Sequence, residues 1–229
     1  MQKQTNLTIK EAKMKKIAVI LSGSGVFDGA EIHEAVLALQ AIEQEGASWH
    51  CFAPNIPQHH VINHLTGEEM AETRNVLVEA ARIARGNIDD IVNLNAVDYD
   101  ALLLPGGFGA AKNLSDFAFT GAGCEVNPEV KRACQAFAKE EKPAAYLCIA
   151  PTLIPAIYGP GAKGTIGDDP DTAHSFNKMG GEHINCPVND FVLDQKRRLL
   201  TTPAYMLAGS ITEAASGINK LVKELVKLA

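Results

Sequence analysis

Short apolar segments alternate with amphipathic helical segments along most of the chain, and this alternation strongly restricts the possible folds. Apolar runs typical of buried strands lie at residues 16–21, 49–53, 101–104, 143–148 and 199–202. Segments with apolar side chains at helical spacing lie at residues 30–45, 68–85, 129–140 and 211–228. Strands that alternate with helices form a mostly parallel sheet with helices on both faces. The sequence therefore predicts an α/β fold of this kind.

The length of 229 residues suits one large domain, or one domain with an inserted lobe. Residues 1–14 precede the first predicted strand and are largely polar, so we expect a flexible N-terminal arm followed by a domain at residues 15–229. Residues 54–95 interrupt the alternation with a loop rich in proline, histidine and asparagine, one helix and a second loop. We interpret residues 54–95 as an insertion.

Charge and cysteine content exclude several classes of partner. The formal net charge of −6 and the lack of a basic block argue against nucleic-acid binding. No apolar stretch reaches the roughly 18 residues that a membrane-spanning helix needs, so we expect no membrane association. The five cysteines form no CxxC pair, which favours reduced thiols. The opening residues lack the apolar core of a signal peptide. Together these features predict a cytoplasmic protein.

Three unusual segments follow directly after predicted strands. They are the glycine-rich loop 22–29, the turn 105–109, and Cys148. Ligands bind outside the carboxyl ends of parallel strands in open α/β sheets, so we expect these segments to form one site. The loop does not match the dinucleotide-binding pattern G-x-G-x-x-G, because its third glycine, Gly29, comes one residue late.

Cys148 ends an apolar strand, and Pro151 just after it is typical of the first turn of a helix. A cysteine at such a junction faces unpaired N–H groups and the positive end of a helix dipole, which favour the thiolate over the thiol. We therefore predict that Cys148 is an ionised nucleophile. The alternative is a buried core cysteine, the commoner state of a free thiol.

Two acidic residues, Glu31 and Glu34, lie at the start of the helix predicted at residues 30–45. From that position one carboxyl group can reach the Cys148 sulfur and transfer its proton as a general acid or base. The alternative is a pair of solvated acids that complement the helix dipole. The N–H groups of Gly107 and Ile149 are candidates for an oxyanion hole, although the glycines also suit a simple turn.

Four histidines lie close together in the sequence: His50, His59, His60 and His64. The i, i+4 spacing of His60 and His64 suits two ligands on one helix face, but a metal site needs further ligands in good geometry. Pro57 and the polar surroundings favour an exposed loop, so we expect no metal site here.

Several motifs resemble those of a known protein family. They are residues 17–29 with Glu34, Leu104-Pro-Gly-Gly107 and Leu147-Cys-Ile-Ala-Pro151. This set resembles the ThiJ/PfpI superfamily, which has the class I glutamine-amidotransferase-like fold. The motifs at residues 20–29, 61–67, 72–77, 105–114 and 201–207 resemble, more narrowly, the enhancing-lycopene-biosynthesis (ElbB-type) group. The resemblance extends from about Lys15 to the C-terminus.

The resemblance implies a flavodoxin-like three-layer sandwich with a nucleophile elbow, in a homodimer. By motif position, Cys148 matches the superfamily nucleophile and Glu34 the carboxyl partner of glyoxalase-type members. Gly107 and Ile149 match the oxyanion-hole amides. Such members convert glyoxal or similar small dicarbonyls to hydroxy acids without glutathione, metal or organic cofactor. We therefore expect a weak, cofactor-independent glyoxalase that acts through a cysteine hemithioacetal.

The sequence departs from the superfamily pattern at one position. Many relatives have a histidine after the next strand, where this chain has Gly164-Thr-Ile-Gly-Asp168, so we do not expect a functional glutamine amidotransferase. Asp168, Asp169 or His174 can substitute for it, and the sequence does not choose among them. The alternative function is a non-catalytic cysteine redox sensor or binding protein linked to isoprenoid metabolism, since oxidants also select acidic, exposed thiols.

Overall fold

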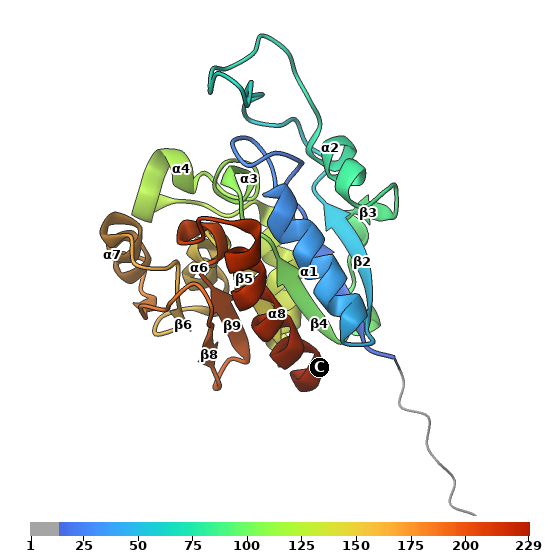
Figure 1. The fold of residues 1–229 in the computed structure, drawn as a ribbon, viewed down its shortest axis with the longest axis vertical. Helices are drawn as coiled ribbons and strands as arrows, with labels where there is room; N and C mark the ends of the chain where they lie inside the picture. The colour runs from blue at the N-terminus through green and yellow to red at the C-terminus, as the bar shows by residue number, and fades with distance from the viewer. Residues whose placement is uncertain (1–13) are drawn as a thin grey trace, which may run out of the picture.

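In the computed structural model, which describes residues 14–229, seven strands form one sheet between two layers of helices (Figure 1). The arm predicted at residues 1–14 lies outside the described residues, except for Met14. The strand order is β3-β2-β1-β4-β5-β9-β8; β8 pairs antiparallel with β9, and the other pairs are parallel. A small second sheet pairs β6 with β7. The strands are β1 (Lys16–Ile20), β2 (Ser48–Ala53), β3 (Ile88–Asp90), β4 (Ala101–Leu104), β5 (Ala144–Leu147), β6 (Lys163–Gly164), β7 (Glu182–His183), β8 (Val192–Asp194) and β9 (Leu199–Thr202).

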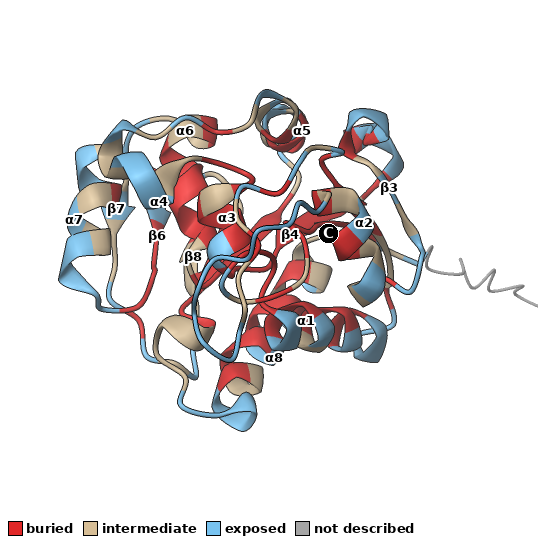
Figure 2. Cartoon of the chain, turned by 90° about the horizontal axis from the view of Figure 1, so that it is seen from above, coloured by how far each residue is buried: buried red, intermediate tan, exposed pale blue. Residues whose placement is uncertain are grey.

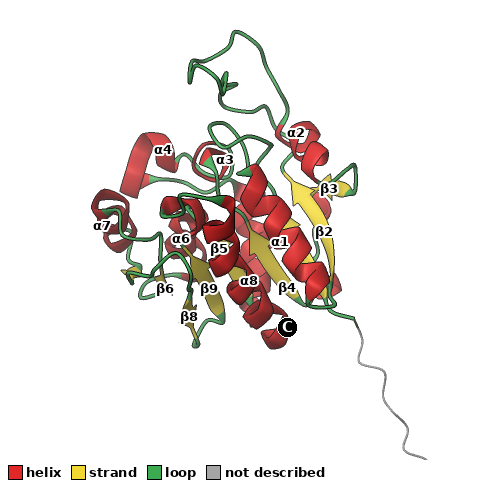
Figure 3. Ribbon diagram, in the orientation of Figure 1, coloured by secondary structure: helices red, strands yellow, loops and turns green. Residues whose placement is uncertain are grey.

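The central strands β1, β4 and β5 are buried on both faces, apart from the first residue of β1. Burial on both faces explains why their sequences are continuous apolar runs. Helices α1, α2 and α8 pack on one face of the sheet, and α3, α5 and α6 on the other (Figures 2 and 3). The helices are α1 (Ile32–Gln44), α2 (Val76–Ile83), α3 (Phe108–Lys112), α4 (Phe117–Thr120), α5 (Pro128–Lys139), α6 (Ile154–Tyr158), α7 (Pro170–Lys178) and α8 (Ile211–Leu228). The predicted α/β sandwich with a mostly parallel sheet is confirmed.

Helix α2 begins at Val76 rather than at residue 68. The side chain of Asn75 caps it by accepting a hydrogen bond from the N–H of Val78 at 3.1 Å. The preceding residues are extended and form isolated antiparallel bridges, Pro57 with Asn75 and Ile62 with Glu69. Residues 88–90, which the sequence predicted as loop, form the edge strand β3.

The helix predicted after Cys148 is broken into two short pieces. Residues Ala150–Leu153 form a 3₁₀-helix, and α6 begins only at Ile154. Pro155 has no N–H to donate to the carbonyl of Pro151, so a continuous α-helical hydrogen-bond pattern cannot form here. Cys148 is therefore followed by a short helical turn rather than by a long helix.

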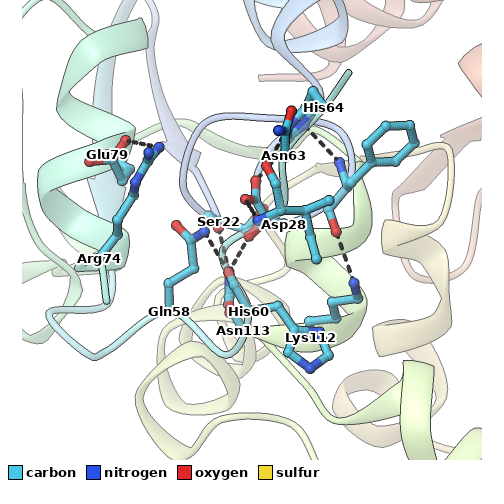
Figure 4. Close-up of polar contacts among 12 residues, drawn as sticks. Ser22, Asp28, Gln58, His60, Asn63, His64, Arg74, Glu79, Lys112 and Asn113 are labelled. Atoms are coloured by element: carbon cyan, nitrogen blue, oxygen red, sulfur yellow. Dashed lines mark hydrogen bonds and ion pairs between the residues drawn. The ribbon is translucent and has the colours of Figure 1, made fainter. Parts of the chain in front are cut away.

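Residues 54–75 extend above the carboxyl end of β2 and contact the glycine-rich loop 22–29 (Figures 1 and 4). The buried carboxylate of Asp28 accepts a hydrogen bond from the N–H of Ile62 at 2.7 Å. The N–H of Phe27 donates to Nε2 of His64 at 3.2 Å. The loop that follows β1 is thus fixed from outside by this segment.

None of the described helices has both the length and the apolar composition needed to cross a membrane.

Candidate active site

Cys148 lies at a sharp turn directly after β5. Its φ of 59° is in the left-handed region, which costs a non-glycine residue about 1–2 kcal/mol. The N–H of Cys148 donates to the carbonyl of Thr202 on β9 at 3.0 Å, so the sheet fixes the backbone on one side of the turn. The residue is 7% exposed and lines a cavity of about 340 Å³. This is the nucleophile elbow that the resemblance implied.

Glu34 is fully buried in the first turn of α1 and is held by backbone groups from two other segments. Its Oε2 accepts a hydrogen bond from the N–H of Gly106 at 2.8 Å, and its Oε1 accepts one from the N–H of Tyr205 at 3.1 Å. Glu31 has a different role, because its Oε2 caps α1 by accepting a hydrogen bond from the N–H of Glu34 at 2.6 Å. Of the two candidate acids, Glu34 is the one placed beside Cys148.

Gly106 packs against both the cysteine and the carboxyl group. A Cβ atom on Gly106 would lie 3.0 Å from Sγ of Cys148 and 2.9 Å from Oε2 of Glu34. The two functional atoms therefore both lie next to the same backbone position. The absence of a side chain at Gly106 lets the two reactive groups interact.

We expect Gly106→Ala to lower the free energy of unfolding by about 1–3 kcal/mol, because the new Cβ would lie 2.4 Å from the Cβ of Cys148. Urea unfolding of both proteins measures the difference. Gly123→Ala is a matched control, since no atom lies within 4 Å of the added Cβ. Equal losses in the two variants would contradict the close packing described here.

Burial raises the pKa of both groups. The pKa of Glu34 rises to about 7, mainly because burial disfavours the carboxylate; the charge of Glu31 adds to this, and the hydrogen bonds from Tyr205 and Gly106 oppose it. The pKa of the Cys148 thiol is well above its ordinary value, mainly through burial and secondly through the negative charge of Glu34. Near pH 7 the thiol therefore keeps its proton, and the neighbouring carboxylate is positioned to accept it.

Burial and the charge of Glu34 shift the pKa of Cys148 upward, which is opposite to the direction that the sequence predicted. That prediction relied on the positive end of a helix dipole, but the turn after Cys148 is a short 3₁₀-helix. The N–H groups of Gly107 and Ile149 do lower the pKa of the thiol, but burial and Glu34 outweigh them. Activation of this sulfur therefore requires transfer of its proton at the time of reaction.

The two candidate oxyanion-hole amides lie at the cavity. The N–H groups of Gly107 and Ile149 act on the Cys148 sulfur by lowering the pKa of its thiol, and both residues line the cavity. Gly107 has a φ of 89°, and a Cβ there would lie 2.4 Å from the backbone atoms Glu31 N and Gly29 O. Only glycine fits at this position.

The structure brings further residues to the cavity, of which the sequence did not single out Tyr205 and Thr172. Tyr205 lies in a 3₁₀-helix after β9, and Ala204 before it has a φ of 45°. Asp169 and Thr172, from the start of α7, form another part of the wall. Tyr205 is part of the 201–207 motif, which could have indicated it. Of the three candidates for the missing histidine, Asp169 lines this cavity, whereas Asp168 and His174 do not.

The clustered histidines have separate partners. His50 pairs with Asp89 at 2.8 Å, and His64 stacks on Phe27. His59 packs against the ring of Phe119. Across residues 14–229 no group of three or more histidine, cysteine or acidic side chains has a geometry suited to a metal ion.

Comparison with known structures identifies the class of protein. The crystal structure of Drosophila melanogaster DJ-1beta aligns with 93% of this chain and 91% of its own, with a TM-score of 0.56 and 17% identity. At that identity the match shows the fold alone. This chain therefore shares the fold of DJ-1beta, and its seven-stranded sheet carries Cys148 at the turn after β5. No family model matches the chain.

More similar proteins define the family within this class. An isoprenoid biosynthesis protein with an amidotransferase-like domain from Ehrlichia chaffeensis is 38% identical; the match covers 93% of this chain and 99% of that one, with a TM-score of 0.87. The rat "ES1 protein homolog, mitochondrial" is 42% identical over 223 residues, which cover 93% of this chain and 84% of the rat protein. The human "Glutamine amidotransferase-like class 1 domain-containing protein 3, mitochondrial" is also 42% identical. That match covers 93% of this chain and 83% of the human protein. The chain belongs to this ES1 family of class I glutamine amidotransferase-like proteins.

These relatives contradict the predicted cytoplasmic location, since both the rat and the human protein are named as mitochondrial. The prediction was wrong because it relied on reduced cysteines and on the lack of a signal-peptide core. A mitochondrial targeting sequence is amphipathic and has no such apolar core. The lack of an apolar core therefore does not distinguish a cytosolic protein from a mitochondrial one.

Proposed function

We propose that this protein is a cofactor-independent glyoxalase that converts glyoxal and related α-oxoaldehydes to α-hydroxy acids. The observation that supports this function is the convergence of four groups: the Cys148 thiol and the N–H groups of Gly107 and Ile149 at the cavity, and the Glu34 carboxyl group buried beside Cys148. They supply a nucleophile, a proton acceptor and two hydrogen-bond donors for an oxyanion. The reaction needs nothing further except water.

In the first step, the Glu34 carboxylate accepts the thiol proton while the sulfur attacks the aldehyde carbon, C1. The C–S bond forms and the carbonyl electron pair moves to oxygen. The N–H groups of Gly107 and Ile149 stabilise the negative charge on that oxygen. Glu34 then delivers its proton to the oxygen, which gives a hemithioacetal.

In the second step, Glu34 removes the hydrogen on C1 as a proton and returns it to C2 through an enediol. The hydroxyl proton of C1 moves to the oxygen of C2. C1 is thereby oxidised to a thioester and C2 is reduced to an alcohol, so the redox change is internal. Water then attacks C1, the C–S bond breaks, the sulfur regains a proton, and glycolate leaves.

Glutamine hydrolysis fits the cavity poorly. No histidine lines it among the described residues, and its charged residues besides the catalytic pair are the acids Glu31 and Asp169.

We expect kcat/KM for glyoxal to rise with pH through about 7 and then to level off. The pKa of Glu34 is about 7, and only its carboxylate form can accept the thiol proton. Below the pKa, activity falls tenfold per pH unit as the carboxyl group becomes protonated. Steady-state rates of glycolate formation between pH 5 and pH 8.5, corrected for the uncatalysed reaction, measure this profile. A flat profile between pH 6 and pH 8 would contradict the role of Glu34 as the base.

A further inference from the structure

We propose that the cavity at Cys148 selects uncharged α-oxoaldehydes with an apolar substituent, such as phenylglyoxal, over glyoxal and over anionic carbonyl compounds. This inference rests on the proposed function, because it names the substrate class of the same site. It follows from three observations: the size of the cavity, the nature of its walls and the sign of its charges.

The cavity is much larger than glyoxal. Its volume is about 340 Å³. Glyoxal has four heavy atoms and fills on the order of 120 Å³ if each occupies the share of one water molecule, about 30 Å³. Bound glyoxal would leave most of the cavity to water, whereas a phenyl or branched alkyl group on C2 would fill the remaining space.

The walls around the remaining space are apolar. Phe108 and Ala111 of α3 lie on one side, Phe117 and Ala118 of α4 on another, and Val26 and Met206 complete the surface. Phe108 is 48% exposed, so much of its ring is in contact with solvent when the cavity is empty. An apolar substituent would cover this ring and gain free energy from the burial of both surfaces.

The charges that face the cavity are negative. Glu31 and Asp169 line it, and Glu34 is buried beside Cys148. Lys112 belongs to the same short helix as Phe108 but lines a neighbouring cavity with Phe27 and Ile62, and its Nζ donates to the carbonyl of Phe27 at 2.9 Å. No lysine or arginine in residues 14–229 lines the cavity at Cys148. The two carboxylates that line the cavity would repel a substrate with a carboxylate or phosphate group.

The first experiment compares kcat/KM for glyoxal, methylglyoxal and phenylglyoxal. Each value is divided by the rate at which the same compound reacts with a free small thiol. We expect phenylglyoxal to exceed glyoxal by at least about tenfold, since apolar groups of this kind change specificity by 10–200-fold. Ala118→Leu fills part of the apolar space and should reduce the ratio at least about threefold. Ala71→Leu, at an exposed position away from the cavity, is the matched control.

The second experiment does not need turnover. It measures the alkylation rate of Cys148 at pH 8 by mass spectrometry of its peptide, with iodoacetamide, iodoacetate and N-phenyl iodoacetamide, each relative to a free thiol. We expect iodoacetate to be at least about tenfold slower than iodoacetamide and the phenyl compound at least about fivefold faster. Asp169→Asn and Glu31→Gln, which keep the shape of the two side chains, should speed the reaction with iodoacetate.

The two experiments separate the two ideas. If no oxoaldehyde is converted but the alkylation rates follow the expected order, the proposed glyoxalase function is wrong and the selectivity of the cavity stands. If the enzyme converts glyoxal as efficiently as phenylglyoxal, or if iodoacetate reacts as fast as iodoacetamide relative to the free thiol, the selectivity proposed here is overturned.

Discussion

Replacement of Cys148 by serine is expected to lower glycolate formation from glyoxal by at least about 1,000-fold. The hydroxyl group of serine gives up its proton far less readily than a thiol, and the pKa of Glu34, about 7, makes its carboxylate too weak a base to compensate. The side chains are similar in size, so the fold should persist. The measurement is glycolate produced per enzyme per unit time, with circular dichroism to confirm the fold.

The matched control for this variant is Cys124→Ser. Cys124 is a partly exposed free cysteine whose Sγ lies 3.5 Å from the sulfur of Met179, and it does not line the cavity. This variant should retain activity within about twofold of the unmodified protein. Full activity in Cys148→Ser would eliminate the mechanism, and an equal loss in both variants would attribute the effect to the fold rather than to the nucleophile.

Replacement of Glu34 by glutamine is expected to lower kcat for glyoxal by about 100- to 10,000-fold, the usual contribution of a positioned acid or base. The amide cannot accept the thiol proton or carry a proton between C1 and C2. It also presents an NH₂ group toward one of the two backbone N–H donors, Gly106 or Tyr205, so one hydrogen bond is lost. The predicted rise of activity through about pH 7 should disappear in this variant.

Glu79→Gln is the control for the loss of a buried carboxyl group. Glu79 is 5% exposed on α2, where it pairs with Arg82 at 2.9 Å, far from the cavity lining. Its replacement should affect stability more than kcat. If Glu34→Gln keeps the activity and the pH profile of the unmodified protein, Glu34 is a structural residue and another group transfers the proton.

Much of the architecture could be predicted because the buried strands have an unmistakable pattern. Strands β1, β4 and β5 are continuous apolar runs, and α5 and α8 begin and end close to their predicted limits. Other elements depend on tertiary contacts rather than on local pattern. The segment 68–75 has a helical composition but is extended, because its backbone pairs with residues 57–62. Helix α7 and the two-residue strands β6 and β7 have no periodic signal long enough to recognise.

The residues of the site were easier to predict than their electrostatics. Cys148, Gly107 and Ile149 could be placed because they follow strand ends, and Glu34 because it begins a helix at the same edge. Tyr205 contributes a backbone N–H to Glu34, which any residue type can provide, so only its place in the 201–207 motif could have indicated it. The upward shift in the pKa of Cys148 was not predicted, because it depends on burial and on the position of Glu34, which are properties of the folded chain.

The central claim is that a protonated thiol and a carboxylate share one proton, with the carboxylate keeping the sulfur neutral until substrate arrives. The pH dependence of Cys148 alkylation by iodoacetamide tests this directly in the unmodified protein and in Glu34→Gln. We expect a midpoint above 9 in the unmodified protein, because burial and Glu34 raise the pKa of the thiol. In the variant, where the negative charge is gone, the midpoint should be lower by at least about one pH unit. An unmodified protein that reacts with a midpoint near 6, or a variant whose midpoint does not fall, would contradict it.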